Sequence, residues 1–298
     1  MIDVSFIKYQ SQPGDSFMKL VSFSHNGNNS FGAVINEGVV DIGARLKLTD
    51  LGAALRQVGI DHVKDVGAKA NADFALSEIG AYRPVVADPN KIFCAGLNYD
   101  EHVKETNRQR TERPTIFMRF AESQIGHEQA ILLPPESDRL DYEAEIAVVI
   151  GKSGRRISEE KAHEHIAGFA CYNDGSVRDW QLHTGQWGPG KNFEATGAFG
   201  PVLVTSDEIG ENEVLTLESR LNGQVMQHAT TDMLIFSIPA LIAYCSTFIT
   251  LTPGDVIVTG TPGGVGAKRN PPVFMKHGDV VEVEVSKLGV LRNPIRAE

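Results

Sequence analysis

Apolar and polar residues alternate in short runs along most of the chain, a pattern that predicts a β-rich fold with few helices. Between residues 18 and 45, Asn-Gly at 26–27 and Glu-Gly at 37–38 separate β-prone runs and predict hairpins. The stretch "LTDLGAALRQVG" then has helical spacing, with Asp50 as its expected N-cap. Two prolines in "YRPVVADPNK", residues 82–91, predict a domain boundary.

Strand patterns dominate the chain after this boundary. We predict strands in "EAEIAVVIG", "GFACYND" and "AFGPVLVT", and a helix capped by Ser158 in "SEEKAHEHIA". Gly-Asp turns introduce two more strands, and in "HGDVVEVEV" alternate valines from Val281 to Val285 would share one face. The segment "SIPALIAYCSTFI" predicts a helix with Ser237 as N-cap.

These elements predict an α+β, β-rich protein with a small N-terminal domain over residues 18–85 and a larger domain over residues 90–298. Met18 begins "MKLVSFSHNG", a segment that is typical of the N-terminus of a protein. We therefore expect residues 1–17 to be an extension or the product of a mis-set start codon.

Composition narrows the class of partner. The 298 residues carry a net charge of −10 without a basic cluster, which argues against nucleic acid and anionic membranes. An anionic small substrate is not excluded, because a bound cation can reverse the local field. No apolar run reaches about 18 residues, and the N-terminal residues do not have the pattern of a secretory signal. The three cysteines are far apart and form no CxxC, so we expect buried, reduced thiols in a cytoplasmic protein.

Three acids alternate in "DYEAEIAVVIGK", where Asp141, Glu143 and Glu145 would point to one face of a strand that enters the core. Such like charges are tolerated if the face is solvated, if the acids hold protons, or if a cation binds between them. Asp174 ends another predicted strand just before a glycine. Two glutamates and this aspartate would form a site for Mg²⁺ or Mn²⁺ with roughly three coordination positions left for ligands.

A second candidate group lies in "GLNYDEHVKET", where His102 and Glu105 would share one face of a helical turn. A carboxylate beside an imidazole raises its basicity, so His102 is a candidate base for activating water; the alternative is an incidental surface contact. Lys191, in the Gly-Pro loop "GPGKNFEATGAFGP", is either solvated or close to a ligand that approaches the glycines. No GxSxG, nucleotide-binding glycine loop or GK[ST] motif supports a competing chemistry.

Five segments in this order resemble the fumarylacetoacetate hydrolase family: "GLNYDEH", "DYEAEIAVVIGK", "GFACYNDGSVRDWQ", "GPGKNFEATGAFGP" and "TPGDVIVTGTPGGVG". The resemblance covers most of residues 91–296 and implies a mixed β-roll or sandwich catalytic domain, in a homodimer or larger homo-oligomer. It implies the following roles: metal ligands Glu143, Glu145 and Asp174; a water-activating pair His102 and Glu105; an active-site lysine at Lys191; and substrate contacts at Arg178, Gln181 and Thr261.

The chain also departs from the family's pattern. Arg119-Phe120 stands where the family often has Lys-Pro, and His127 where Gly or Pro is commoner. We expect Arg119 to pair with a substrate carboxylate. Asp141 matches no ligand of the family and is treated as a flanking residue.

The resemblance implies a Mg²⁺- or Mn²⁺-dependent hydrolase that cleaves a C–C bond in a small anionic 1,3-diketo acid, such as an acylpyruvate or a fumarylacetoacetate-like compound, in the catabolism of an aromatic or sugar acid. Two alternatives remain. One is a 2-oxo acid isomerase or decarboxylase, of the oxaloacetate decarboxylase or hydroxymuconate isomerase type, that uses the same metal–enolate chemistry. The other is a non-catalytic protein whose acids hold a structural ion.

Overall fold

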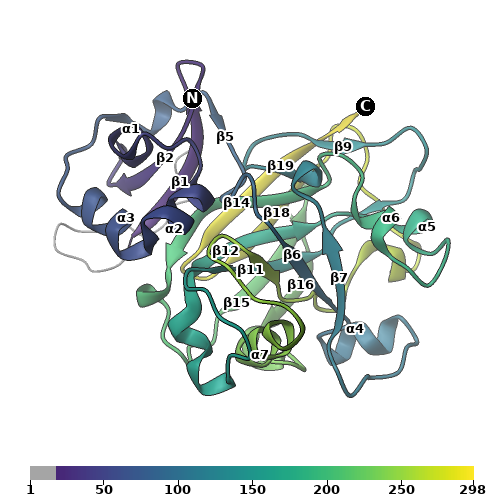
Figure 1. Cartoon of the computed structure of the whole chain (residues 1–298). Coiled ribbons are helices and arrows are strands. Elements are labelled where there is room, and N and C mark those ends of the chain that lie inside the picture. Colours follow the sequence, from purple (N-terminus) through teal and green to yellow (C-terminus); the bar gives the residue numbers. More distant parts are fainter. Residues whose placement is uncertain (1–17) are drawn as a thin grey trace.

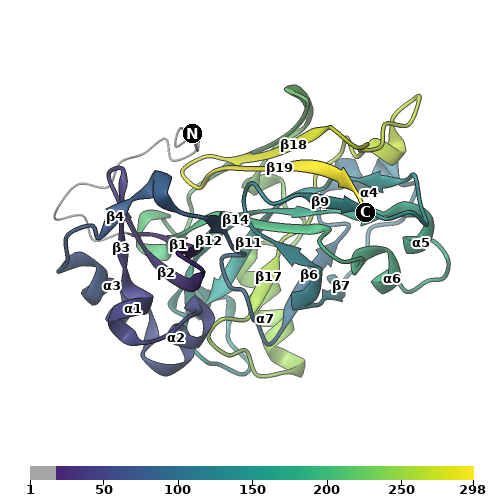
Figure 2. The same ribbon diagram turned by 90° about the horizontal axis from the view of Figure 1, so that it is seen from above.

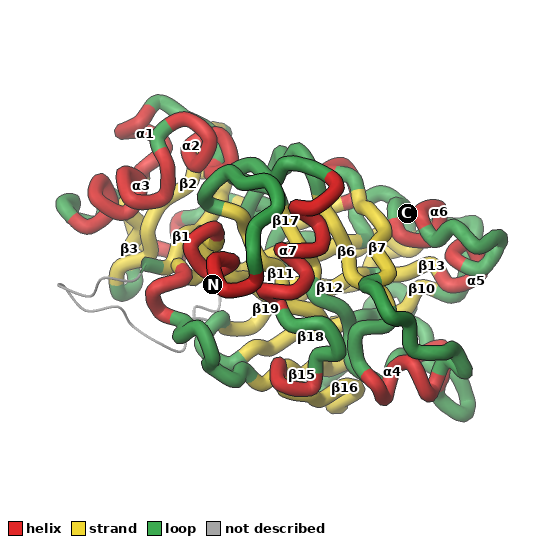
Figure 3. The backbone as a smooth tube through the Cα atoms, turned by 60° about the horizontal axis from the view of Figure 1, so that its bottom comes forward, coloured by secondary structure: helices red, strands yellow, loops and turns green. Residues whose placement is uncertain are grey.

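Two β-sheets pack face to face (Figures 1 and 2). Their apolar side chains form the main core of the protein. This computed structural model describes residues 18–298, so the expectation of an extension over residues 1–17 lies outside the described residues. Helices gather at the two ends of the sheets: α1 to α3 lie at one end and α4 to α6 at the other (Figure 3). The predicted α+β, β-rich class is confirmed.

The larger sheet has the strand order β4-β3-β2-β1-β14-β12-β11-β17-β6-β7, with β5 beside β1 and β8 beside β14. Its strands are β1 (Lys19–His25), β2 (Asn28–Ile35), β3 (Gly38–Asp41), β4 (Phe74–Ala75), β5 (Ala81–Tyr82), β6 (Ile92–Gly96), β7 (Thr115–Arg119), β8 (Gln124–Ile125), β11 (Ala144–Ile150), β12 (Ile166–Asp174), β14 (Gly197–Thr205) and β17 (Val256–Val258). Because β1 pairs with β14, the N-terminal hairpins extend the same sheet that holds the later strands.

The smaller sheet has the order β16-β15-β18-β19-β9. Its strands are β9 (Ile131–Leu133), β15 (Thr216–Leu221), β16 (Gln224–Thr230), β18 (Val280–Val285) and β19 (Gly289–Ala297). The alternation predicted for β18 is confirmed, since Val281, Val283 and Val285 are buried in the core between the sheets. On the opposite face, Glu282 and Glu284 form ion pairs with Arg220.

Seven α-helices are described: α1 (Ile42–Leu46), α2 (Leu51–Gln57), α3 (Gly59–Ala68), α4 (Asp100–Glu105), α5 (Arg178–Gln181), α6 (Gly188–Lys191) and α7 (Ile238–Phe248). The N-cap predictions hold for α2 and α7, because Asp50 and Ser237 accept the backbone N–H of the residue three positions later. The helix predicted after Ser158 is a 3₁₀-helix, η3 (Glu159–His165), without a side-chain cap. The other 3₁₀-helices are η1 (Leu76–Glu78), η2 (Ala121–Ser123), η4 (Ser206–Glu208), η5 (Thr231–Met233) and η6 (Gly266–Lys268).

No helix in residues 18–298 has the length and apolar character that a membrane span requires.

The central strand β11 is buried on both faces. Ile146 and Val148 join the core between the sheets, whereas Ala147 and Val149 face a second core that includes residues of the N-terminal helices. This explains the continuous apolar run after Glu145. The strand that was expected to carry Asp141, Glu143 and Glu145 on one face is interrupted, because Asp141 belongs to a separate pair formed by β10 (Leu140–Asp141) and β13 (Ser176–Val177).

Candidate metal centre and active site

Three buried carboxylates meet where β11 and β12 lie side by side. Glu143 precedes β11, Glu145 lies on it, and Asp174 ends β12. The antiparallel register, which pairs Glu145 with Tyr172, brings the ends of the two strands together. Each residue offers one oxygen, and these three atoms lie within 4.8 Å of one another. The three residues predicted to be metal ligands are therefore in one cluster.

Three cationic side chains form ion pairs with this cluster: Lys191, Arg178 and, with Asp174, Arg119. The Lys191 ammonium lies 2.6 Å from Oε2 of Glu143 and 2.6 Å from Oδ2 of Asp174. Nη1 of Arg178 lies 2.7 Å from Oε1 of Glu143. Burial disfavours the charged form of Glu143, but Lys191 and Arg178 outweigh it and lower the pKa of this carboxyl to about 2. Glu143 is therefore ionised across the neutral pH range.

Glu145 differs from its two neighbours. It accepts the backbone N–H of Gly260 at 2.5 Å, but within residues 18–298 no cation forms an ion pair with it. Burial, and then the negative charges of Asp174 and Glu143, raise the pKa of Glu145 well above its ordinary value. A buried carboxylate in this position is stabilised either by a proton or by a divalent cation. Three hard oxygen donors fit Mg²⁺ or Mn²⁺, which Glu143, Glu145 and Asp174 would hold.

A cavity of about 520 Å³ opens beside these carboxylates. Residues from β6, β7 and β11 of the larger sheet, from α4 to α6 and from the loops between them form its wall. Among the predicted site residues, those on the wall are His102, Glu143, Glu145, Arg178, Gln181, Lys191 and Thr261. The cavity therefore connects two of the three candidate metal ligands with three of the four expected substrate contacts.

The expected His102–Glu105 pair is present on α4. Nδ1 of His102 lies 2.7 Å from Oε1 of Glu105, and the second carboxylate oxygen accepts the N–H of Gly264 at 2.9 Å. Because an ionised carboxylate only accepts hydrogen bonds, Nδ1 carries the ring hydrogen of the neutral imidazole. Nε2 of His102 is then left to exchange a proton at the cavity, so the pair is more than an incidental surface contact.

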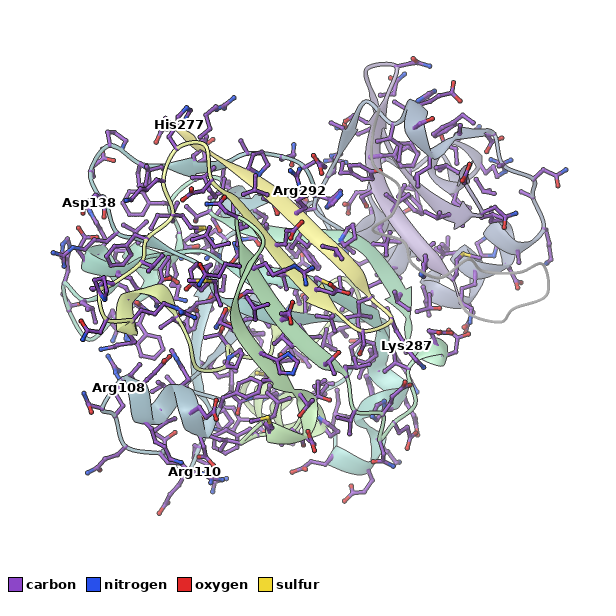
Figure 4. All side chains as sticks on the ribbon, turned by 180° about the vertical axis from the view of Figure 1, so that it is seen from behind. Arg108, Arg110, Asp138, His277, Lys287 and Arg292 are labelled. Atoms are coloured by element: carbon purple, nitrogen blue, oxygen red, sulfur yellow. The ribbon has the colours of Figure 1, made fainter. Side chains whose placement is uncertain are left out.

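An aromatic contact that was not predicted closes one side of the cavity. The Trp187 ring lies 5.5 Å from that of Phe117, and the Arg108 guanidinium lies 5.0 Å from the centre of the Trp187 ring. Gly96 permits this arrangement, since a Cβ there would lie 2.3 Å from a Trp187 ring atom. Figure 4 shows Arg108 and Asp138, both on the cavity wall, along the same edge of the molecule.

The structure corrects the role expected for Arg119. Its side chain is buried behind Asp174 and is not on the cavity wall. Nη1 donates to Oδ1 of Asp174 at 2.6 Å and to the carbonyl of Gly175 at 3.0 Å, while Nη2 donates to Thr196 at 2.8 Å. With its donors engaged in the core, Arg119 holds a candidate metal ligand in place instead of facing the cavity.

Asp141, treated as a flanking residue, is a hydrogen-bond centre. It is fully buried, and it accepts the backbone N–H groups of Gly266 at 2.8 Å and Ala267 at 2.9 Å. It also accepts Nε–H of Arg178 at 2.8 Å. Asp141 therefore connects the loop over the cavity to Arg178. The alternation of acids in the sequence pointed to this residue, although it gave no indication of its partners.

Comparison with known proteins identifies the family. Residues 91–296 match the family model described as fumarylacetoacetate (FAA) hydrolase C-terminal. The chain belongs to the fumarylacetoacetate hydrolase family. This confirms the resemblance seen in the sequence, and the catalytic part of the fold is of the type that the resemblance implied.

Relatives within the family include two named oxaloacetate tautomerases. The mitochondrial oxaloacetate tautomerase of Xenopus laevis is 45% identical over 221 residues, which are 74% of this chain and 69% of that protein. A mitochondrial oxaloacetate tautomerase of Homo sapiens is 44% identical, over 74% of this chain and 70% of that protein. The similarity thus extends over more than two thirds of each of these relatives.

Solved structures share the fold over nearly the whole chain. A putative HpcE protein from Mycobacterium smegmatis has a TM-score of 0.85 and 33% identity, covering 94% of this chain and 99% of that one. The maleylpyruvate hydrolase of Sphingobium sp. SYK-6, solved with manganese(II) and pyruvate, has a TM-score of 0.77 and 26% identity over the same shares. Together with the acidic cluster, these comparisons make the chain a metal-dependent enzyme of the family.

Proposed function

We propose that this protein interconverts the keto and enol forms of oxaloacetate, or of a closely similar 2-oxo dicarboxylic acid, with a bound divalent cation. The observation that carries the proposal is the cluster of Glu143, Glu145 and Asp174 beside a cavity that also holds His102. The names of the two tautomerases, 44–45% identical to this chain, support the choice of reaction. The proposal replaces C–C hydrolysis, the first expectation from the sequence, as the primary candidate.

The residues of the site have distinct parts in this reaction. A divalent cation held by the three carboxylates would supply electrostatic stabilisation of negative charge that develops on the substrate oxygen. Nε2 of His102 takes the proton from C3, and the imidazolium returns a proton to the oxygen on C2, so atoms and charge balance. Glu105 keeps the ring oriented. The Lys191 ammonium adds positive charge beside Glu143 and Asp174.

The charges on the cavity wall favour a dianionic substrate. Five cationic side chains line the cavity: Arg108, Arg139, Arg178, Lys191 and Lys268. Four acids line it, two of which are candidate metal ligands: Asp138, Glu143, Glu145 and Asp179. A bound divalent cation would add two further positive charges. Nη2 of Arg178 is buried and has no hydrogen-bond partner within residues 18–298, so it is available to a substrate carboxylate.

A specific observation also favours hydrolysis of an acylpyruvate as a second candidate. The His102–Glu105 pair can take a proton from water as well as from carbon, and the maleylpyruvate hydrolase with the same fold is a hydrolase by name. In that reaction, hydroxide attacks the distal carbonyl, while Arg178 and Gln181 stabilise the oxyanion. The oxyanion then collapses, the C–C bond breaks, and pyruvate leaves as its enolate, which takes back the proton held by His102. Both residues are on the cavity wall, and they are joined by a hydrogen bond of 3.0 Å.

The decisive experiment offers Mn²⁺-loaded and chelator-treated protein a panel of substrates. Loss of the enol absorbance of oxaloacetate, at constant total oxaloacetate, measures tautomerisation. Pyruvate released from oxaloacetate indicates decarboxylation, and pyruvate released from an acylpyruvate indicates hydrolysis. We expect metal-dependent tautomerisation that His102→Ala removes while Mn²⁺ still binds. No metal-dependent turnover of any of these compounds would favour a structural ion instead.

We also propose that the protein works as a homodimer or larger homo-oligomer in the cytoplasm. Two exposed apolar side chains at the edge strand β7 support an association surface: Met118 is 53% exposed and Phe120, just after the strand, is 63% exposed. Light scattering after size-exclusion chromatography would test the assembly, and a monomer at micromolar concentration would contradict it.

A further inference from the structure

Gln227 is a buried residue of the smaller sheet that contacts both the metal-ligand strand and the cavity wall. It lies on β16 and is 2% exposed. Its Oε1 accepts the backbone N–H of Ala144, the residue between the two glutamates, at 3.0 Å. Its Nε2 donates to Oγ1 of Thr261 at 2.7 Å and to the carbonyl of Pro262 at 2.9 Å. One amide therefore ties the ligand strand to the loop that borders the cavity.

The partners of Gln227 permit only one orientation of its amide. The backbone N–H of Ala144 can only donate, and the carbonyl of Pro262 can only accept. A flipped amide would place NH₂ against the Ala144 donor and a carbonyl against the Pro262 acceptor. The Ser219 hydroxyl adds a further donor to Oε1, at 2.9 Å. Nε2 is therefore the atom that faces Thr261.

This orientation determines what the Thr261 hydroxyl can do. Its oxygen accepts a hydrogen from Gln227, so its own hydrogen must point elsewhere. Within residues 18–298, this hydroxyl donates no hydrogen bond to another residue. Thr261 is 3% exposed and lines the cavity together with Glu143 and Glu145. The direction that remains for the hydrogen is the cavity, where it would meet a ligand oxygen.

We propose that Gln227 is a positioning residue that makes Thr261 a hydrogen-bond donor to the 2-oxo acid. The inference rests on the proposed function, because that function supplies the anionic oxygen that receives the hydrogen. A threonine hydroxyl is otherwise free to donate or accept; here the amide removes that freedom before the substrate enters. Through Ala144, the same amide keeps the donor at a fixed distance from the metal ligands.

The test measures binding of pyruvate, a 2-oxo acid, to the full-length Mn²⁺-loaded protein by calorimetry. Thr261→Val removes the hydroxyl at nearly constant shape, and Thr261→Ser retains it. Gln227→Met removes the amide at similar length. Its matched control is Gln224→Met, the same change at an exposed position on the same strand. Mn²⁺ affinity and the melting temperature are measured for every variant.

We expect Thr261→Val and Gln227→Met each to weaken pyruvate binding about tenfold or more, as for loss of a hydrogen bond to a charged group. The double variant should bind no more weakly than either single variant, because both remove the same donor. Thr261→Ser and Gln224→Met should bind like wild type, and Mn²⁺ affinity should stay unchanged. If Gln227→Met does not fold, the comparison of Thr261→Val with Thr261→Ser still decides whether the hydroxyl donates.

Three results would overturn the inference. The first is that Thr261→Val binds pyruvate as tightly as wild type. The second is that the double variant loses affinity by the product of the two single-variant factors, which would indicate that the two residues act independently. Mn²⁺-loaded wild type that binds no pyruvate would overturn this inference and the proposed function together. Failure of the inference and failure of the proposed function can also be distinguished. If the variants show the expected pyruvate affinities but the wild-type protein does not catalyse keto–enol exchange, only the proposed function is rejected.

Discussion

Nη1 of Arg119 lies 2.6 Å from Oδ1 of Asp174, and both side chains have no exposed surface. Asp174 is also 2.6 Å from the Lys191 ammonium, through its other oxygen. The candidate ligand is thus held between a guanidinium in the core and an ammonium at the cavity. A fixed carboxylate of this kind is expected to bind a cation better than a mobile one, because its orientation is already set.

Replacing Arg119 by Met should therefore affect both stability and metal binding. We expect the free energy of unfolding to fall by about 3 kcal/mol, because a buried carboxylate loses a charged partner. We expect Mn²⁺ affinity to fall about tenfold, as for other residues that orient metal ligands. Urea unfolding and calorimetry measure the two effects. Arg119→Lys, which keeps the charge but not the planar fork, should lie in between; wild-type values for Arg119→Met would refute the role.

Asp141→Asn is expected to disturb the substrate side of the site. The carboxylate of Asp141 accepts hydrogen bonds from Gly266, Ala267 and Arg178. An amide has only one oxygen, so its NH₂ group would face at least one of these donors, which would lose its acceptor. We expect the free energy of unfolding to fall by about 3 kcal/mol, because a buried charge pair is broken. Since Arg178 loses an anchor, KM for oxaloacetate should rise more than kcat falls. Unchanged KM in a folded variant would argue that Arg178 does not need this anchor.

The parts of the fold that were predicted depend on local chemistry. The hairpin at Asn26-Gly27 follows from two residues that accept positive φ, at 50° and 80°. The caps of α2 and α7 depend on one oxygen and a nearby backbone N–H. The sharing of one sheet by β1 and β14 was not predicted, because it joins residues about 180 positions apart and leaves no local pattern.

The candidate site shows the same division. The three acids of the candidate metal centre could be named because carboxylates on strand ends form a recognisable chemical pattern, supported by family resemblance. The roles of Arg119 and Asp141 could not be derived from the sequence. Each depends on a contact with a residue far along the chain: Arg119 with Asp174, and Asp141 with Arg178. No sequence pattern indicated the role of Gln227, because the partners that place it at the site, Thr261 and Ala144, lie 34 and 83 positions away.

Glu145→Gln should stabilise the metal-free protein at neutral and alkaline pH. In the folded protein, burial and the charges of Asp174 and Glu143 raise the pKa of Glu145 above its unfolded value. The folded state then binds more protons than the unfolded state between these two pKa values, so stability falls as pH rises through that range. Glutamine carries no charge and still offers an oxygen to the N–H of Gly260. In EDTA at about pH 8, the variant should melt at a higher temperature than wild type.

Two further measurements sharpen the test of Glu145. At about pH 5 the difference in melting temperature should shrink, because more of the wild-type carboxyl is protonated. In excess Mn²⁺ the order should reverse, since binding stabilises wild type by about 2.7 kcal/mol at a hundredfold excess over Kd and the variant lacks a ligand. Calorimetry in buffers of different ionisation enthalpy should show proton release when Mn²⁺ binds to wild type. If Glu145→Gln is less stable than wild type in EDTA at every pH, the ionised Glu145 carboxylate does not destabilise the metal-free protein, and the prediction is wrong.

Glu105→Gln tests whether the carboxylate on α4 serves the base. Glu105 accepts from His102 with one oxygen and from the N–H of Gly264 with the other, whereas an amide has a single oxygen. One of these donors must lose its acceptor, so the imidazole is held less firmly and its protonated form loses a negative partner. We expect kcat/KM for oxaloacetate to fall at least tenfold, and His102→Ala to cost about a hundredfold or more.

Glu101→Gln, an exposed neighbour on α4, should behave like wild type. Because Glu105 is not a metal ligand, Mn²⁺ affinity should stay constant; full activity of Glu105→Gln would instead mean that His102 works without an orienting carboxylate.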